Sequence, residues 1–163
     1  MTKLLVLSDT HARSLRELPQ SVTDAVKGTE WVVHCGDFTS LSVLRELQSI
    51  AKHFVGVYGN SDPPDVRDEL PAETIIELEG KRIAVIHPPW GGSPDKLEEK
   101  LSARFPGVDA ILFGHTHDTC NEIINGVLMF NPGQSYAFHS MPVNAGIVTV
   151  TRKGLAGKLI MLG

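Results

Sequence analysis

Imidazole, carboxylate and amide side chains recur in this sequence in short motifs that could bind a metal. Gly114 ends the apolar run 110–113 and is followed by His115 and His117. On an extended or turning segment, residues two apart project to the same side, so these two imidazoles lie together. Neutral imidazole is a common metal ligand. Taken alone, the pair fits a metal site and two exposed loop histidines about equally well.

The same order, an apolar strand, then a glycine or polar turn, then a potential ligand, recurs earlier in the chain. Asp9 and His11 follow the apolar run 4–7, although Asp9 could simply cap a turn and leave His11 exposed. Gly-Asn before two prolines could likewise be no more than a turn. The remaining ligand types are Asp37 after 31–35, Asn60 after 54–58 and His87 after 83–86.

Strands alternate with helices in the first half of the chain. We expect a helix over 15–27, interrupted near Pro19, and a second one around 43–47. The second helix has Thr39, Ser40 and Ser42 as candidate N-caps, which leaves Asp37 free for another role. This alternation is typical of βαβ units, whose parallel strands collect sites at their carboxyl ends.

The second half is richer in hairpins. Strands are expected over 74–79 and 82–86, joined at Gly80, and a helix from Ser93 or Asp95 to Leu101. Asn-Gly at 125–126 is a strong type I′ turn signal between strands 122–124 and 127–130. A last hairpin over 145–151 and 155–162 turns around residues 153–154.

Every potential ligand lies just beyond the carboxyl end of an apolar strand, and five such coincidences are improbable as structural accidents. The donors are too many for one tetrahedral zinc ion, but they suit two metals bridged by one carboxylate. Mixed nitrogen and oxygen donors favour Mn²⁺, Fe, Zn²⁺, Ni²⁺ or Co²⁺ over Ca²⁺ or Mg²⁺ without choosing among them. Two such ions about 3.5–4 Å apart can activate water for an in-line phosphoryl displacement.

In this order, Asp-x-His, Gly-Asp, Gly-Asn, a lone His and Gly-His-x-His, the motifs resemble the calcineurin-like metallophosphoesterase superfamily. The short chain and the Asn-Pro-Gly at 131–133 resemble its small bacterial and archaeal phosphodiesterase branch. The resemblance implies a four-layer α-β-β-α sandwich, with two mixed β-sheets flanked by helices, formed by a single domain over 1–163. The expected strands allow this architecture without establishing it.

The family pattern also implies roles for these residues. A metal-bound hydroxide would attack phosphorus while the metals stabilise the developing negative charge. We expect two divalent transition-metal ions, Mn²⁺ before Ni²⁺, Zn²⁺, Fe or Co²⁺. Asp37, Asn60, His115 and Asp62 are the expected catalytic residues. The expected ligands are Asp9, His11 and His117 for one metal and Asn60, His87 and His115 for the other, with Asp37 bridging both.

The sequence departs from the family pattern in three places. Ser61 stands where many members have a histidine that could protonate the leaving group, so good leaving groups should be preferred. The acidic position after it is kept by Asp62, which could orient a ligand. A Pro-Pro-Trp segment at 88–90 replaces the second histidine after His87, and Gln134 is inserted into the family's Asn-Pro-Gly-Ser.

Three histidines stand outside these motifs. His34 lies in the strand that leads to Asp37 and could support the ligands or be a structural histidine with satisfied hydrogen bonds. His53 is expected at a helix end or on the surface. His139 follows Tyr-Ala-Phe and could line the cleft.

Composition narrows the classes of partner. The net charge of −4 and the lack of an evident basic stripe argue against stable nucleic-acid binding. Cys35 and Cys120 form no C-x-x-C pair, and no apolar run approaches the ~20 residues that span a bilayer. We therefore expect a cytoplasmic protein that acts on a small-molecule or nucleotide-type phosphodiester, away from the membrane.

Two other functions compete with phosphodiester hydrolysis. A member of the same fold can lose catalysis and serve as a protein scaffold, as the retromer subunit of this superfamily does. The complete ligand set argues for an enzyme, because a degenerate scaffold is expected to lose imidazoles. A nuclease is disfavoured by the acidic balance. A homo-oligomer could form if strand edges of the C-terminal hairpin pair between subunits.

Overall fold

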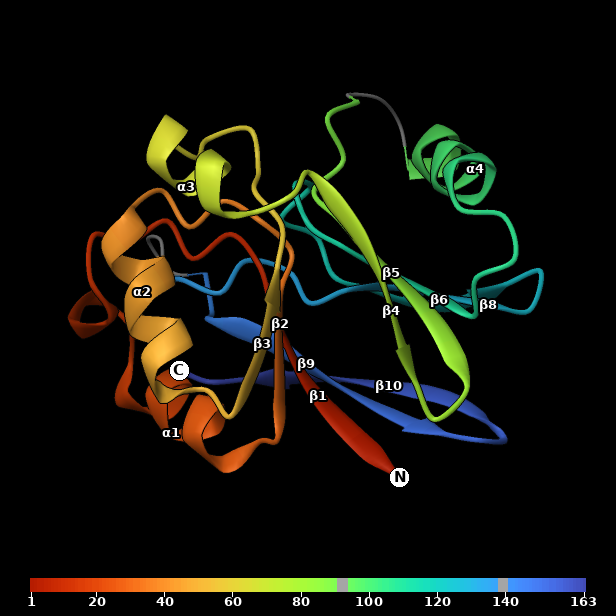
Figure 1. The fold of residues 1–163 in the computed structure, drawn as a ribbon, viewed down its shortest axis with the longest axis horizontal. Helices are drawn as coiled ribbons and strands as arrows, with labels where there is room; N and C mark the ends of the chain where they lie inside the picture. The colour runs from red at the N-terminus through yellow and green to blue at the C-terminus, as the bar shows by residue number, and fades with distance from the viewer. Residues whose placement is uncertain (91–93, 138–140) are drawn as a thin grey trace.

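The computed structural model describes residues 1–90, 94–137 and 141–163, and its framework is a pair of five-stranded β-sheets (Figure 1). The strand order is β10-β9-β1-β2-β3 in the first sheet and β4-β5-β6-β8-β7 in the second. The first sheet comprises β1 (Thr2–Leu7), β2 (Trp31–His34), β3 (His53–Gly56), β9 (Asn144–Thr151) and β10 (Gly154–Met161). The second comprises β4 (Glu73–Leu78), β5 (Lys81–Ile86), β6 (Ala110–Phe113), β7 (Cys120–Ile124) and β8 (Val127–Asn131).

Each sheet contains a parallel group of strands. In the first sheet β1 pairs in parallel with β2, and β2 with β3, while β9 runs antiparallel to β1. In the second sheet β5, β6 and β8 are parallel, and β4 and β7 are antiparallel edge strands. Since parallel strands end at one edge, each sheet brings several strand ends to the same place.

Strand β1 is apolar on both sides because both of its faces are covered. Leu4 and Val6 point into the core between the two sheets, whereas Leu5 and Leu7 point toward the helices. This two-residue alternation is the normal geometry of a strand. The core between the sheets also contains Val33 and Phe130, both fully buried.

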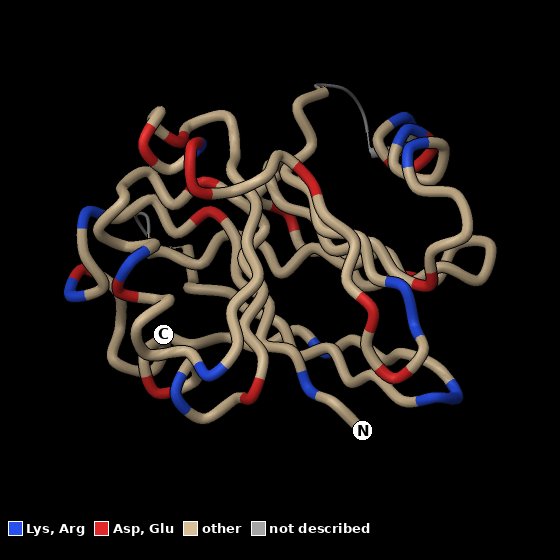
Figure 2. Tube along the Cα trace, in the orientation of Figure 1, with Lys and Arg blue, Asp and Glu red and all other residues tan. Residues whose placement is uncertain are grey.

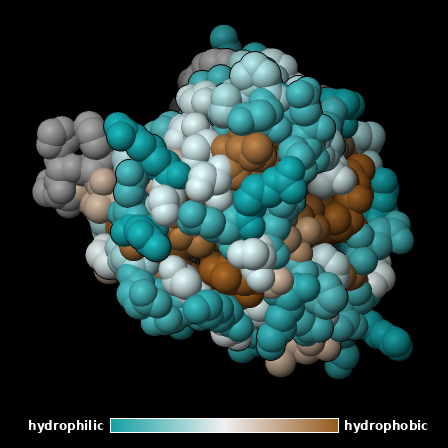
Figure 3. All heavy atoms as spheres, turned by 60° about the vertical axis from the view of Figure 1, so that its left-hand side comes forward, coloured by the Kyte–Doolittle hydropathy of each residue, from teal (hydrophilic) through white to brown (hydrophobic). Residues whose placement is uncertain are grey.

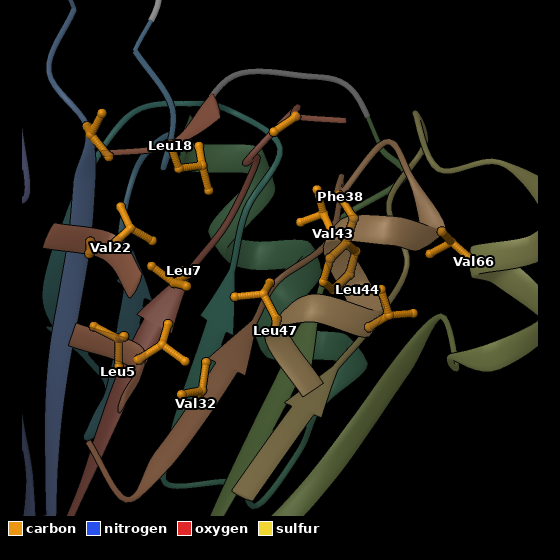
Figure 4. Close-up of a cluster of buried hydrophobic side chains, with 14 residues drawn as sticks. Leu5, Leu7, Leu18, Val22, Val32, Phe38, Val43, Leu44, Leu47 and Val66 are labelled. Atoms are coloured by element: carbon orange, nitrogen blue, oxygen red, sulfur yellow. The ribbon is translucent and has the colours of Figure 1, made fainter. Parts of the chain in front are cut away.

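Helices cover the outer faces of both sheets. Leu44 and Leu47 of α2 pack on the outer face of the first sheet, as Figure 4 shows, and Leu101 of α4 packs on the second. Burying one leucine of this kind stabilises the fold by about 1.5–3 kcal/mol. The order of layers is therefore α-β-β-α, which confirms the expected fold class. The helices are α1 (Gln20–Gly28), α2 (Leu41–Ile50), α3 (Pro64–Glu69) and α4 (Pro94–Arg104), with a 3-10 turn at Leu15–Glu17.

Most of the expected elements are present, with local differences. The helix expected over 15–27 is split at Pro19, and Ser40 caps α2 by accepting the Val43 N–H. The Asn125-Gly126 turn joins β7 to β8 with positive φ at both residues, as a type I′ turn requires. Helix α3 was not expected. It begins at Pro64, where a proline is tolerated because the first helical N–H needs no partner.

The surface is mixed in charge. Figure 2 shows acidic and basic residues interspersed along the trace of the described chain. On the face in Figure 3, hydrophilic residues predominate and hydrophobic ones form separate patches. Within the described ranges, none of the helices is long and apolar enough to cross a membrane.

Candidate metal centre

The backbone is unusual where the candidate ligands lie. Most of the described non-glycine residues with positive φ belong to these strand ends, and the others include hairpin positions. Such a conformation costs about 1–3 kcal/mol at a non-glycine residue and persists only where the surroundings enforce it. It turns successive side chains toward one point. The ligand-type residues concerned are Asp9 (φ 52°), His11 (φ 40°), Asp37 (φ 60°), His115 (φ 81°) and His117 (φ 63°).

Asp9, His11 and His117 form a first cluster. Oδ1 of Asp9 lies 3.3 Å from Nε2 of His117 and 3.7 Å from Nε2 of His11. The other oxygen, Oδ2, accepts hydrogen bonds from the Ser8 hydroxyl at 2.6 Å and from the His115 N–H at 3.2 Å. These bonds fix the carboxylate with Oδ1 facing the two imidazoles.

Asn60, His87 and His115 form a second cluster. Oδ1 of Asn60 lies 2.8 Å from Nε2 of His87 and 3.0 Å from Nδ1 of His115. The two imidazole nitrogens are 3.3 Å apart. Asn60 follows a strand of the first sheet, whereas the histidines follow strands of the second, so the cluster closes across the sandwich.

Asp37 lies between the two clusters. Its Oδ2 is 3.4 Å from Nε2 of His11 and 3.4 Å from Nε2 of His87. Its Oδ1 accepts the Ser61 N–H at 2.9 Å, which fixes the rotation of the carboxylate. One oxygen therefore faces a histidine of each cluster.

The chemistry of these atoms fits cations. Oδ1 of Asp9 and Nε2 of His11 are buried and make no hydrogen bond among the described residues. Nδ1 of His87 is 2.8 Å from the Cys35 carbonyl, which can only accept, so the neutral ring donates there and leaves Nε2 as a lone pair. That lone pair faces the carbonyl oxygen of Asn60. Acceptors that converge without donors need a positive charge among them.

The ionisation of the first cluster agrees with this conclusion. Burial alone would raise the pKa of Asp9, but the nearby imidazoles of His11 and His117 outweigh it and hold the pKa well below its usual range. The same contacts with Asp37 and Asp9 raise the pKa of His11 to about 9, and Asp9 raises the pKa of His117. Without a cation, a proton would take its place.

Asp62 holds the loops rather than facing the clusters. Its carboxylate accepts the backbone N–H groups of Asp37 at 3.0 Å, Thr39 at 2.8 Å and Gly59 at 2.8 Å. Burial raises the pKa of Asp62 in spite of these donors. The residue thus ties the loop after β2 to the loop before Asn60, while its expected roles in catalysis and in orienting a ligand stay predictions.

Two glycines of the motifs are required because atoms of other residues lie too close to leave room for a side chain. A Cβ on Gly114 would overlap the Ser8 hydroxyl and lie 2.9 Å from Oδ2 of Asp9. A Cβ on Gly59 would lie 2.6 Å from the backbone nitrogen of Asp37 and overlap its carboxylate. The glycine of each motif therefore makes room for a ligand from another strand.

His34 is both satisfied and linked to the site. It is fully buried, accepts the Gly36 N–H at Nδ1 and contacts the Thr10 hydroxyl through Nε2 at 3.2 Å. Burial lowers its pKa to about 3, so it stays neutral at ordinary pH. Its ring stacks on Phe38, with centroids 3.7 Å apart. By contrast, His53 is an exposed residue at the start of β3, and His139 lies outside the described residues.

Several supporting residues carried only a weak sequence signal. Asn131, from the Asn-Pro-Gly motif, donates to the Thr116 hydroxyl at 3.0 Å and so braces the segment between His115 and His117. Tyr136 places its ring 5.1 Å from that of His11. Its type and spacing gave no indication of this role, because only the fold brings it to the strand ends. The inserted Gln134 donates to the carbonyl of Tyr136.

Comparison with known proteins identifies the family. The sequence profile of the calcineurin-like phosphoesterase superfamily domain matches residues 2–153, which is most of the chain. The fold, with its two mixed sheets and outer helices, is the one this family shares. The chain belongs to the calcineurin-like phosphoesterase superfamily.

Individual relatives agree with this assignment. A probable metallophosphoesterase of Methanocaldococcus jannaschii is 36% identical over 133 residues, which cover 78% of this chain and 65% of that protein, slightly under two thirds of its length. A phosphodiesterase of the same organism is 27% identical and covers 93% of this chain and 95% of its own. The structure of Vacuolar Protein Sorting 29 from Cryptosporidium parvum shares the fold, with a TM-score of 0.77 and 22% identity over 98% of this chain and 96% of that one.

Proposed function

We propose that this protein hydrolyses phosphodiesters with the help of two divalent transition-metal ions. The observation that carries the proposal is the position of Asp37, whose Oδ2 lies 3.4 Å from one histidine of each cluster. Family membership supports phosphoester hydrolysis in general. The preference for diesters is supported by the relative named a phosphodiesterase.

The two clusters would hold one ion each. Asp9, His11 and His117 are the proposed ligands of the first ion. Asn60, His87 and His115 are those of the second, and Asp37 would bridge them. Mn²⁺ is the expected native ion, with Ni²⁺, Zn²⁺, Fe and Co²⁺ as alternatives. Bound ions of this kind polarise phosphoryl oxygens and make water nucleophilic near neutral pH.

The chain itself contributes rigid placement. Ser61 N–H and the Asp62 carboxylate fix the side chain and the backbone of Asp37, respectively. Metal-ligand atoms that are held in a prearranged array need not reorganise when charge develops on a substrate. Such placement is the main task of a protein in phosphoryl transfer.

The side chains considered near the candidate site are poor acids for protonating the leaving group. Ser61 is exposed and its hydroxyl is too weak an acid to serve near neutral pH. Burial and Asp9 raise the pKa of Tyr136, which makes its phenol a weaker acid than an ordinary tyrosine. We therefore expect esters with good leaving groups to react fastest.

A scaffold role is the alternative, and the likeness to Vacuolar Protein Sorting 29 concerns the fold alone. The full set of converging candidate metal ligands favours the hydrolase. A protein that binds two metals and turns over neither diesters nor monoesters would favour the scaffold.

The test is elemental analysis of the purified protein together with hydrolysis of bis-p-nitrophenyl phosphate and p-nitrophenyl phosphate. Stripped protein is reloaded with Mn²⁺, Ni²⁺ or Zn²⁺. We expect about two ions per chain and faster turnover of the diester, both lost in Asp37→Ala. The exposed carboxylate Asp24 on α1 provides the matched control, Asp24→Ala. A metal-free protein, or full activity in Asp37→Ala, would overturn the proposal.

A further inference from the structure

Two pockets border the second cluster. One, of about 350 Å³, is lined by Asn60 and His87 and contains two arginines, and we call it the arginine pocket. The other, of about 450 Å³, is lined by His115 and contains three carboxylates, and we call it the acidic pocket. The arginine pocket is defined by Tyr58, Asn60, Arg67, His87, Trp90 and Arg104, and the acidic pocket by Trp90, Glu98, His115, Asp118, Cys120 and Glu122.

The two pockets meet at one place. Nε2 of His87, on the arginine-pocket side, lies 3.3 Å from Nδ1 of His115, on the acidic-pocket side. Among the described lining residues, Trp90 is shared by both pockets. A group bound at these two histidines therefore has space for a substituent in each of two directions. A phosphate monoester has one substituent, whereas a diester has two.

The arginine pocket suits an anionic substituent. Arg67 is held in place because its Nε donates to the carbonyl of Asp62 at 2.8 Å and its Nη2 to that of Asn60 at 3.0 Å. Its guanidinium also lies 5.0 Å from the centre of the Tyr58 ring. Arg104 is paired with Glu73, which also lines the pocket, so the described lining holds two arginines against one carboxylate and has an excess of positive charge.

The acidic pocket has the opposite character. Its described lining contains Glu98, Asp118 and Glu122 and neither lysine nor arginine. Burial, with the charges of Glu122 and Glu98, raises the pKa of Cys120 to about 11, as expected in a negative field. Trp90 also lines this pocket, and aromatic side chains can attract cations.

We propose that the substrate is an asymmetric phosphodiester, with an anionic arm in the arginine pocket and a cationic arm in the acidic pocket, and with Trp90 beside both arms. The inference rests on the proposed phosphodiesterase function. Each arm is a small group, since the volume of each pocket lies near the lower end of the range for ligand-binding pockets. Trp90, Arg104 and Glu122 then determine specificity without touching the reacting atoms.

The experiment compares p-nitrophenyl diesters that differ only in the second arm. The arms are methyl, which fills neither pocket, choline, which is cationic, and 2-carboxyethyl, which is anionic. We expect Arg104→Gln to lower kcat/KM for the carboxyethyl ester at least fivefold relative to the methyl ester, and Glu122→Gln to do the same for the choline ester. Trp90→Ala should lower kcat/KM for both the carboxyethyl and the choline ester relative to the methyl ester. Trp90→Phe should restore part of this loss. Arg13→Gln and Glu99→Gln, at exposed positions outside both pockets, are the matched controls.

Binding gives a second readout. Trp31→Phe leaves Trp90 as the sole tryptophan of the chain. Its emission should change on addition of the slowly hydrolysed phosphorothioate forms of the choline and carboxyethyl esters, and not of the methyl ester.

The outcomes separate the two proposals. If the loaded wild type fails to hydrolyse even the methyl ester, the proposed function falls and this inference with it. If the methyl ester reacts but the variants change all three esters by the same factor, the two-armed substrate is wrong while the phosphodiesterase stands.

Discussion

Oδ2 of Asp37 lies 3.4 Å from Nε2 of His87, although the two residues follow strands of different sheets. Asp37 comes after β2 of the first sheet and His87 after β5 of the second. The proposed metal centre therefore depends on how the two sheets pack, and disturbing either loop should affect metal binding and stability together.

Removal of metal should destabilise the protein. A ligand that binds only the folded state stabilises it by about 2.7 kcal/mol at 100 times its Kd. For a chain of this size, each kcal/mol shifts Tm by roughly 2–4 °C, so chelation should lower Tm by about 5–10 °C. Differential scanning calorimetry with EDTA and with excess Mn²⁺ measures the shift. In Asp37→Ala the shift should shrink, and an unchanged shift would contradict the bridging role.

The stability of the metal-free protein should fall between about pH 6.5 and pH 9. The pKa of His11 is raised to about 9 by Asp37 and Asp9, from an ordinary value near 6.5. The stabilisation is therefore complete below pH 6.5 and is lost as pH rises through 9. Thermal unfolding in EDTA across this range measures it, and His11→Gln should flatten the decline. His53→Gln, at an exposed histidine away from the clusters, should retain it.

Metal affinity should rise with pH over the same range, because His11 must lose its proton before it can bind a cation. Near pH 7, binding should release protons. Isothermal titration with Mn²⁺ in buffers of different ionisation enthalpy counts them. A binding enthalpy that is the same in every buffer would show that His11 is not protonated in the metal-free state.

Asp62→Asn should weaken metal binding without abolishing the fold. The amide keeps the shape of the carboxylate but replaces one acceptor oxygen by a donor, so the three N–H bonds to Asp37, Thr39 and Gly59 cannot all survive. Mutation of a residue that orients metal ligands typically lowers metal affinity or activity by about 10–100-fold. Titration of stripped protein with Mn²⁺ measures the loss. Asp68→Asn, at an exposed residue of α3, is the control, and equal affinities would refute the role.

Gly114→Ala should disturb the proposed metal centre through steric overlap with the residues that hold Asp9 in place. The added methyl group would overlap the Ser8 hydroxyl and approach Oδ2 of Asp9, so the Asp9 carboxylate must move. We expect a loss of about 1–3 kcal/mol in the free energy of unfolding, which is typical of overpacking. Metal content should also fall. Gly28→Ala is matched to it, because a Cβ there meets no atom within 4 Å and should be tolerated.

The sequence by itself determined most of the elements and the position of each candidate ligand along them. Strands such as 4–7 are recognisable because apolar residues cover both of their faces, and a potential ligand follows each strand end. The Asn125-Gly126 hairpin was predictable because local steric preferences alone specify that turn. Helix α3 was missed, since its opening prolines are equally typical of a turn.

Only the tertiary structure decided which side chains meet. The distances from Asp37 to His11 and His87, the Asp37 and Thr39 N–H bonds to Asp62, and the approach of Tyr136 to His11 all join segments far apart in the sequence. Spacing along a chain cannot encode such contacts, because they depend on which strands pair within a sheet and, for Asp37 and His87, on the packing of one sheet on the other. The two pockets around Trp90 arise in the same way, from residues of several strands and loops that share no local pattern.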